Sequence, residues 1–143
     1  MSLIVVGVDG SEASKRALSW AIEEGRLRQA KVRAVHAWQY PVSDAWAGVP
    51  VNIYDVLEES AKAQLAAIVA EAGADAEGVE QVVVLGAAAP GLLDASRDAD
   101  LLVVGSRGLG GFKGLLIGSV SQQCVHHAPC PVVVIPHAGD ADS

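Results

Sequence analysis

The segment from Gly105 to Gly118 carries the residue types that bind phosphate groups. It holds six glycines, where an average usage of about 7% predicts one. Glycine loses more chain entropy on folding than any other residue, but its lack of a side chain lets a polyphosphate approach main-chain N–H groups. The segment leads into a predicted helix, whose N-terminus adds unpaired N–H donors and roughly half a positive charge. It therefore predicts an anion site, with four side chains as further candidate donors: Arg107, Lys113, Ser119 and Ser121.

Two other glycine-rich motifs fit this segment less well. A P-loop requires the spacing G-x4-G-K-S/T, which the sequence lacks. Gly108, Gly110 and Gly114 approach a dinucleotide-binding fingerprint, but that fingerprint needs an acidic residue at the end of the next strand. The acidic residue that follows the next strand here, Asp140, lies in the C-terminal tail. A third alternative stays open, in which the segment is a loop without a ligand.

Asp9 is a second candidate site residue, because it directly follows the first apolar run in the sequence VGVDGS. In open parallel sheets, ligands bind beyond the carboxyl ends of the strands where the winding direction reverses. If the first and fourth predicted strands are neighbours, Asp9 and Gly105 face each other across one crevice. The alternative is that Asp9 caps the helix that follows, which is worth about 1 kcal/mol.

The elements that position these residues are predicted from the apolar pattern. Five short apolar runs are predicted as strands: Leu3–Val8, Lys31–Trp38, Glu80–Gly86, Asp100–Ser106 and Pro131–Pro136. Three of these runs are nearly continuous Val, Ile and Leu, which is typical of parallel strands covered on both faces. Apolar residues at helical spacing predict four helices: Glu12–Gln29, Ile53–Ala72, Pro90–Asp98 and Ser119–His127. The alternation predicts an α/β fold with a single doubly wound parallel sheet of five strands and helices on both faces.

Composition limits the classes of protein. The chain has 143 residues, 51% of them hydrophobic, and a net charge of −7, which suits one globular domain. We expect that domain to span residues 1–138, with a short polar tail at 139–143. The sequence has no cluster of Lys and Arg for nucleic acid, and no apolar run as long as a membrane span. It has two cysteines, too few for a disulfide scaffold, and no targeting signal, so we expect a cytoplasmic protein.

Three segments resemble the universal stress protein family. Gly105, Gly108, Gly118 and Ser119 form the pattern G-x2-G-x9-G-S, which is similar to the family's ATP-binding signature. The segments IVVGVDGSEAS and APCPVVVIP resemble the family's first and last strands, and the resemblance covers nearly the whole chain. It implies the strand order 3-2-1-4-5, which places the first and fourth strands side by side. It also implies binding of ATP, with Mg held through the phosphates, and homodimers joined through the last strand: Val132, Val133, Val134 and Ile135.

The resemblance also implies the nucleotide-binding residues. Val8 and Asp9 would line the crevice, and Val35 would contact adenine through its main chain. Three residues of the glycine-rich segment would lie near the ribose and phosphates: Gly105, Arg107 and Gly108. Four residues at the helix start would hold the phosphates: Gly118, Ser119, Val120 and Ser121. The resemblance implies no catalytic residue and no metal ligand from the protein.

The leading hypothesis is therefore an ATP-binding, nucleotide-dependent regulatory or stress-tolerance module. One alternative is a slow ATP hydrolase of the same fold, although the sequence has no obvious general base beside the glycine-rich segment, and His36 is the only histidine on a predicted strand that could approach the crevice. The other is an interaction protein that binds no nucleotide. The sequence CVHHAPC also holds zinc-type ligands at Cys124, His126, His127 and Cys130, although Cys124 equally fits a buried core position. Trp46, in the long segment before the second helix, is a candidate lid residue.

Overall fold

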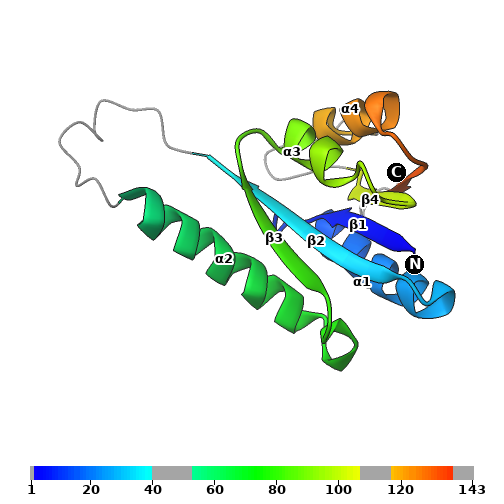
Figure 1. Cartoon of the computed structure of the whole chain (residues 1–143), viewed down its shortest axis with the longest axis horizontal. Helices are drawn as coiled ribbons and strands as arrows, with labels where there is room; N and C mark the ends of the chain where they lie inside the picture. Colours follow the sequence, from blue (N-terminus) through cyan, green and yellow to red (C-terminus); the bar gives the residue numbers. More distant parts are fainter. Residues whose placement is uncertain (1, 40–52, 107–116, 137–143) are drawn as a thin grey trace.

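The computed structural model describes residues 2–39, 53–106 and 117–136. Within these ranges lie all the predicted strands and helices (Figure 1). Their bounds are β1 Leu3–Gly7, α1 Glu12–Arg28, β2 Lys31–Trp38, α2 Ile53–Glu71, the short 3-10 helix η2 Ala74–Ala76, β3 Glu80–Leu85, α3 Ala88–Ala95, β4 Leu101–Gly105, α4 Ser119–His127 and β5 Val132–Ile135. The expected polar tail at 139–143 lies outside the described residues.

The five strands form one parallel sheet in the order β3-β2-β1-β4-β5, so the expected fold and strand order are confirmed. β1 and β4 are direct neighbours, with Val5 of β1 in register with Leu102 of β4. The chain winds from β1 outward to β2 and β3, then returns to β4 on the other side of β1. The winding direction therefore reverses between β1 and β4, which is where parallel sheets of this kind bind ligands.

The helices cover the sheet in two layers, and strand β1 shows why. Its side chains alternate, so Ile4 and Val6 enter one buried apolar cluster while Leu3 and Val5 enter the other. The first cluster includes residues of α1 and α2, and the second includes residues of α3 and α4. Figure 1 shows these two pairs of helices on opposite sides of the sheet. A strand buried on both faces explains the near-continuous apolar runs in the sequence.

Three of the four helices differ from the prediction at one or both ends: α1 ends at Arg28 rather than Gln29, α2 ends at Glu71 rather than Ala72, and α3 differs at both ends. Helix α3 begins at Ala88 rather than Pro90 and ends at Ala95 rather than Asp98. Pro90 is tolerated as the third residue because the N–H groups of a first turn have no partner within the helix. Helix α2 ends at Glu71, and Gly73 follows with φ of 91°, a conformation that favours glycine. In the described ranges, no helix combines the length and hydrophobicity that a bilayer span requires.

Candidate functional site

A pocket lies at the carboxyl edge of the sheet, where β1 and β4 end side by side. The pocket has a cavity volume of about 90 Å³, well below the roughly 300–1,000 Å³ of a site that encloses a whole small-molecule ligand. A larger ligand would therefore place one part inside and extend the rest outward. The pocket is lined by residues of the strands β1, β2 and β4, of the turn after β1, and of the helices α1, α3 and α4: Gly7, Val8, Asp9, Ser14, Val35, Ala37, Ala88, Leu92, Val104, Gly105, Val120 and Ser121.

The turn from β1 into α1 forms one wall of the pocket. Asp9 Oδ1 accepts a 2.8 Å hydrogen bond from the Ser11 N–H, and Gly10 between them has φ of 87°. The N-cap of α1 is Ser11, whose Oγ accepts from the Ser14 N–H at 3.2 Å. The capping role considered for Asp9 therefore belongs to Ser11. The Asp9 side chain closes the turn and lines the pocket.

The N-terminus of α4 forms the opposite wall. Gly118 is the N-cap, and its carbonyl accepts from the Gln122 N–H at 2.9 Å. The main-chain N–H groups of Ser119, Val120 and Ser121 belong to the first turn, so α4 contains no carbonyl that could accept from them. Gly118 has no side chain that could cap them, and two of these residues, Val120 and Ser121, line the pocket. This wall therefore presents uncapped donors and the positive end of a helix dipole.

Gly118 is not explained by backbone strain. Its φ of −77° and ψ of 169° lie in the extended region that every residue type adopts. The position therefore does not require glycine for its conformation. The physical consequence of glycine here is that no side chain stands in front of the α4 amides.

Two of the predicted phosphate donors are engaged within the protein. The Gly118 N–H donates to the Ser106 carbonyl at 2.5 Å, and the Ser121 hydroxyl donates to the Gly105 carbonyl. These bonds join the start of α4 to the end of β4. The main-chain amides and the exposed Ser119 hydroxyl are then the groups of this turn best placed for an anion.

Gly105 has a packing reason to be glycine. A Cβ atom at this position would stand 2.8 Å from the carbonyl carbon of Ala13 and 3.0 Å from the Ser14 main-chain nitrogen. Real Cβ atoms essentially never approach backbone so closely. Gly105 thus allows α1 to pack directly against the end of β4, which brings the two walls of the pocket together.

The end of β2 contributes main chain to the floor of the pocket. The Val35 carbonyl accepts from the Val8 N–H at 2.9 Å, and Gly7–Val35 is the last pair in register between β1 and β2. Alternate residues of a parallel strand direct their N–H and C=O groups to the same neighbour. Ala37 therefore directs its main-chain N–H and C=O toward the β1 side of β2, as Val35 does. At the level of Ala37, however, no residue of β1 is in register with β2.

The structure brings most of the predicted site residues together. Val8, Asp9, Val35, Gly105, Val120 and Ser121 line the pocket, and Gly118 and Ser119 form the adjoining helix start. Arg107, Gly108, Lys113 and Trp46 lie outside the described residues. Sequence reasoning missed the small and apolar lining residues Gly7, Ala37, Ala88, Leu92 and Val104, which carry no side-chain chemistry. It also missed Ser14, which its spacing of three residues from the N-cap could have indicated.

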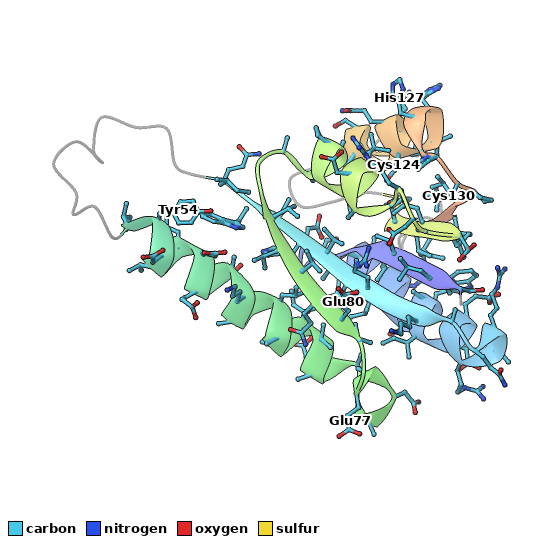
Figure 2. The ribbon with its side chains drawn as sticks, viewed as in Figure 1. Tyr54, Glu77, Glu80, Cys124, His127 and Cys130 are labelled. Atoms are coloured by element: carbon cyan, nitrogen blue, oxygen red, sulfur yellow. The ribbon has the colours of Figure 1, made fainter. Side chains whose placement is uncertain are left out.

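The Cys and His residues near the C-terminus do not form a cluster. Cys124 is fully buried in the core, and burial raises the pKa of its thiol to about 11. His126 and His127 are exposed on α4, and Figure 2 shows His127 on the outer side of the helix. Both cysteines are free, and the described part of the chain contains no group of three or more ligands suited to a metal. The core interpretation of Cys124 is confirmed.

Comparison with known proteins identifies the family of this chain. The model of the universal stress protein family matches residues 1–136. A universal stress protein of Mycobacterium tuberculosis is 37% identical over 146 residues, which cover 92% of this chain and 46% of that protein. This chain thus spans about half the length of the curated relatives it matches.

Solved structures that resemble this chain are also described as universal stress proteins. One, described as a universal stress protein in complex with cAMP, is 29% identical with a TM-score of 0.69, and the match covers 94% of this chain and 96% of that one. Another, from Archaeoglobus fulgidus and described as a complex with dAMP, is 25% identical with a TM-score of 0.60. That match covers 94% of this chain and 98% of the other.

Proposed function

Because the chain belongs to the universal stress protein family, we propose that its pocket binds an adenine nucleotide, ATP together with Mg, and that the protein is a nucleotide-dependent regulatory or stress-tolerance module. The uncapped N-terminus of α4 carries this proposal. Its amides stand beside a pocket at the point where the winding of the sheet reverses. Related structures described as cAMP and dAMP complexes support the adenine class of ligand.

The pocket suits the base rather than the phosphates. Seven of its lining residues have apolar side chains: Val8, Val35, Ala37, Ala88, Leu92, Val104 and Val120. A flat aromatic base fits such a lining, whereas desolvation of a phosphate there is costly. The base therefore occupies the pocket, and the phosphates extend to the helix start formed by Gly118 and Ser119.

Main-chain groups provide base recognition in this proposal. Val35 has its carbonyl engaged with β1, although the second lone pair remains for another donor. Ala37 lines the pocket and lies beyond the last residue of β2 that is in register with β1. We assign the edge of the adenine to Ala37, with Val35 behind it. Asp9, the one acidic residue among the described residues that line the pocket, accepts from a ribose hydroxyl.

The residues present fit a magnesium nucleotide. Mg²⁺ is usually held by substrate phosphates with one or two carboxylates and several waters, and not by a cage of protein ligands. Asp9 supplies one carboxylate at the pocket, and the α4 amides direct the phosphates. When bound, the ion would supply positive charge that offsets the charge of the phosphates. Asp9 orients the sugar and attracts the ion, and the helix start holds the phosphate oxygens.

Homodimerisation through β5 completes the proposal. β5 stands at the edge of the sheet, and Val132, Val133 and Val134 are only partly buried. An apolar edge strand is a template for pairing with another chain, and a second copy gives a closed two-fold dimer. Two free thiols fit a reducing, cytoplasmic location.

Calorimetric titration tests the nucleotide assignment. We expect saturable binding of ATP with Mg, tighter than binding of GTP with Mg, because main-chain groups at β2 select the base edge. Removal of Mg with EDTA should weaken the binding of ATP more than the binding of cAMP, because cAMP carries less charge. Absence of binding by ATP, AMP and cAMP alike to folded protein would contradict the proposed function.

A further inference from the structure

The peptide group that joins Val8 to Asp9 is held on both sides by buried side chains. On one side, the Val8 carbonyl lies 2.9 Å from His36 Nδ1. On the other, the Asp9 N–H donates to Ser14 Oγ at 3.2 Å. A carbonyl oxygen only accepts hydrogen bonds, so His36 Nδ1 is the donor of this bond. His36 comes from β2 and Ser14 from α1, and they are 9% and 4% exposed.

These two bonds fix the rotation of one peptide plane. A trans peptide is planar, and its C=O and N–H point in opposite directions. Rotation of the plane therefore breaks both bonds together. Ser14 is itself fixed, because its hydroxyl donates to the Ser11 carbonyl at 3.0 Å. Both partners are thus rigid parts of neighbouring elements.

The plane lies where the sheet no longer constrains the chain. Gly7 is the last residue of β1 in register with β2, and the Val8 N–H makes one more bond, to the Val35 carbonyl. Beyond that point the chain turns through Gly10, whose φ of 87° marks a sharp change of direction. The direction of the Asp9 side chain consequently depends on the plane that His36 and Ser14 hold.

We propose that His36 and Ser14 are positioning residues for the nucleotide site, which hold the Val8–Asp9 peptide so that Asp9 and the pocket wall are preformed before the ligand binds. The inference rests on the proposed nucleotide function. A preformed wall raises affinity because binding does not have to order it. This role for His36 differs from that of a catalytic base, since its Nδ1 is directed at the main chain.

Four variants test the inference by calorimetric titration with ATP and Mg, each also measured by thermal unfolding without nucleotide. Ser14→Ala and His36→Leu each remove one bond and should weaken affinity by about three- to tenfold, the range of one hydrogen bond. His36→Asn should recover most of the loss, because its amide nitrogen occupies the place of Nδ1. Ser96→Ala is the matched control: Ser96 is a fully buried serine whose hydroxyl donates to the Leu92 carbonyl, and its loss should lower stability without changing affinity.

The double variant Ser14→Ala/His36→Leu should lose less affinity than the product of the two single losses, because either change alone frees the same plane. In His36→Leu, the Asp9 amide should also exchange its hydrogen faster, although Ser14 is still present. If His36→Leu does not fold, Ser14→Ala against Ser96→Ala carries the test.

The outcomes separate the two proposals. If the wild-type chain binds no adenine nucleotide, the proposed function fails and this inference fails with it. If the wild type binds ATP and both single variants bind it with the affinity of the wild type, only the positioning role is overturned. Equal loss of affinity in Ser96→Ala would likewise overturn it, because the effect would then follow stability alone.

Discussion

Substitution of Gly118 by Asp sets an internal carboxylate against the ligand phosphate at the start of α4. The backbone at Gly118 already has extended angles, so Asp is accommodated without strain. As an N-cap residue, Asp accepts from the amides of the first turn and is better than Gly by only a few tenths of a kcal/mol. The variant should therefore fold with equal or slightly higher stability.

Nucleotide binding should respond in the opposite sense. Two unit negative charges about 4 Å apart repel by roughly 1 kcal/mol in water and roughly 4 kcal/mol near a protein surface. Since about 1.4 kcal/mol is tenfold in affinity, we expect at least a tenfold loss for ATP with Mg. The assay is calorimetric titration at fixed ionic strength, with unfolding monitored in parallel. The affinity for adenosine, which has no phosphate, should fall much less.

Two matched variants isolate the cause. Gly118→Ser adds an uncharged cap and should weaken the binding of ATP less than Gly118→Asp does. Ala87→Asp places the same carboxylate at the exposed, uncapped N-cap of the neighbouring helix α3, and should gain stability with a smaller effect on affinity. Unchanged ATP affinity in folded Gly118→Asp would refute the reasoning, because the phosphates would then bind elsewhere.

Four further outcomes follow from the structure. Asp9→Asn should weaken ATP binding in titrations, and the amide oxygen can still accept from the Ser11 N–H, so thermal unfolding should show a folded protein with a cooperative transition. Gly105→Ala should lower the free energy of unfolding in urea by about 1–3 kcal/mol, because its Cβ meets the Ala13 backbone at 2.8 Å. Burial raises the pKa of the Cys124 thiol from an ordinary value of 9.0 to about 11, so the free energy of unfolding should fall as pH rises from about 9 to about 11, by at most about 3 kcal/mol. Cys124→Ala should flatten that part of the pH–stability curve. Val133→Lys should convert a dimer to a monomer in sedimentation equilibrium if β5 is the interface.

The fold could be predicted because its signal is periodic and local. The apolar runs around Val5 and Val103 identify strands buried on both faces, and helix α1 begins at Glu12, where the sequence predicts it. The start of α3 could not be placed, because Ala88 and Pro90 are both acceptable within a first turn.

The candidate site was predictable only where side chains carry chemistry. Asp9 and the turn at Gly118 stand out in the sequence, whereas Ala37 contributes main chain whose availability depends on where β1 ends. The hydrogen bond from His36 to Val8 joins residues 28 positions apart, and register alone brings them together. The sequence likewise gives no sign that the Ser121 hydroxyl is engaged with the Gly105 carbonyl.

The most direct test of the central claim is an NMR titration of ¹⁵N-labelled protein with ATP and Mg. The account predicts saturable shifts of the Ser119, Val120 and Ser121 amides, with the Ala37 amide shifting at the same nucleotide concentration. AMP and adenosine should still shift the Ala37 amide resonance, whereas the shifts of the α4 amides should become smaller from ATP to AMP to adenosine. Saturable binding of ATP that leaves the first turn of α4 unshifted would contradict it.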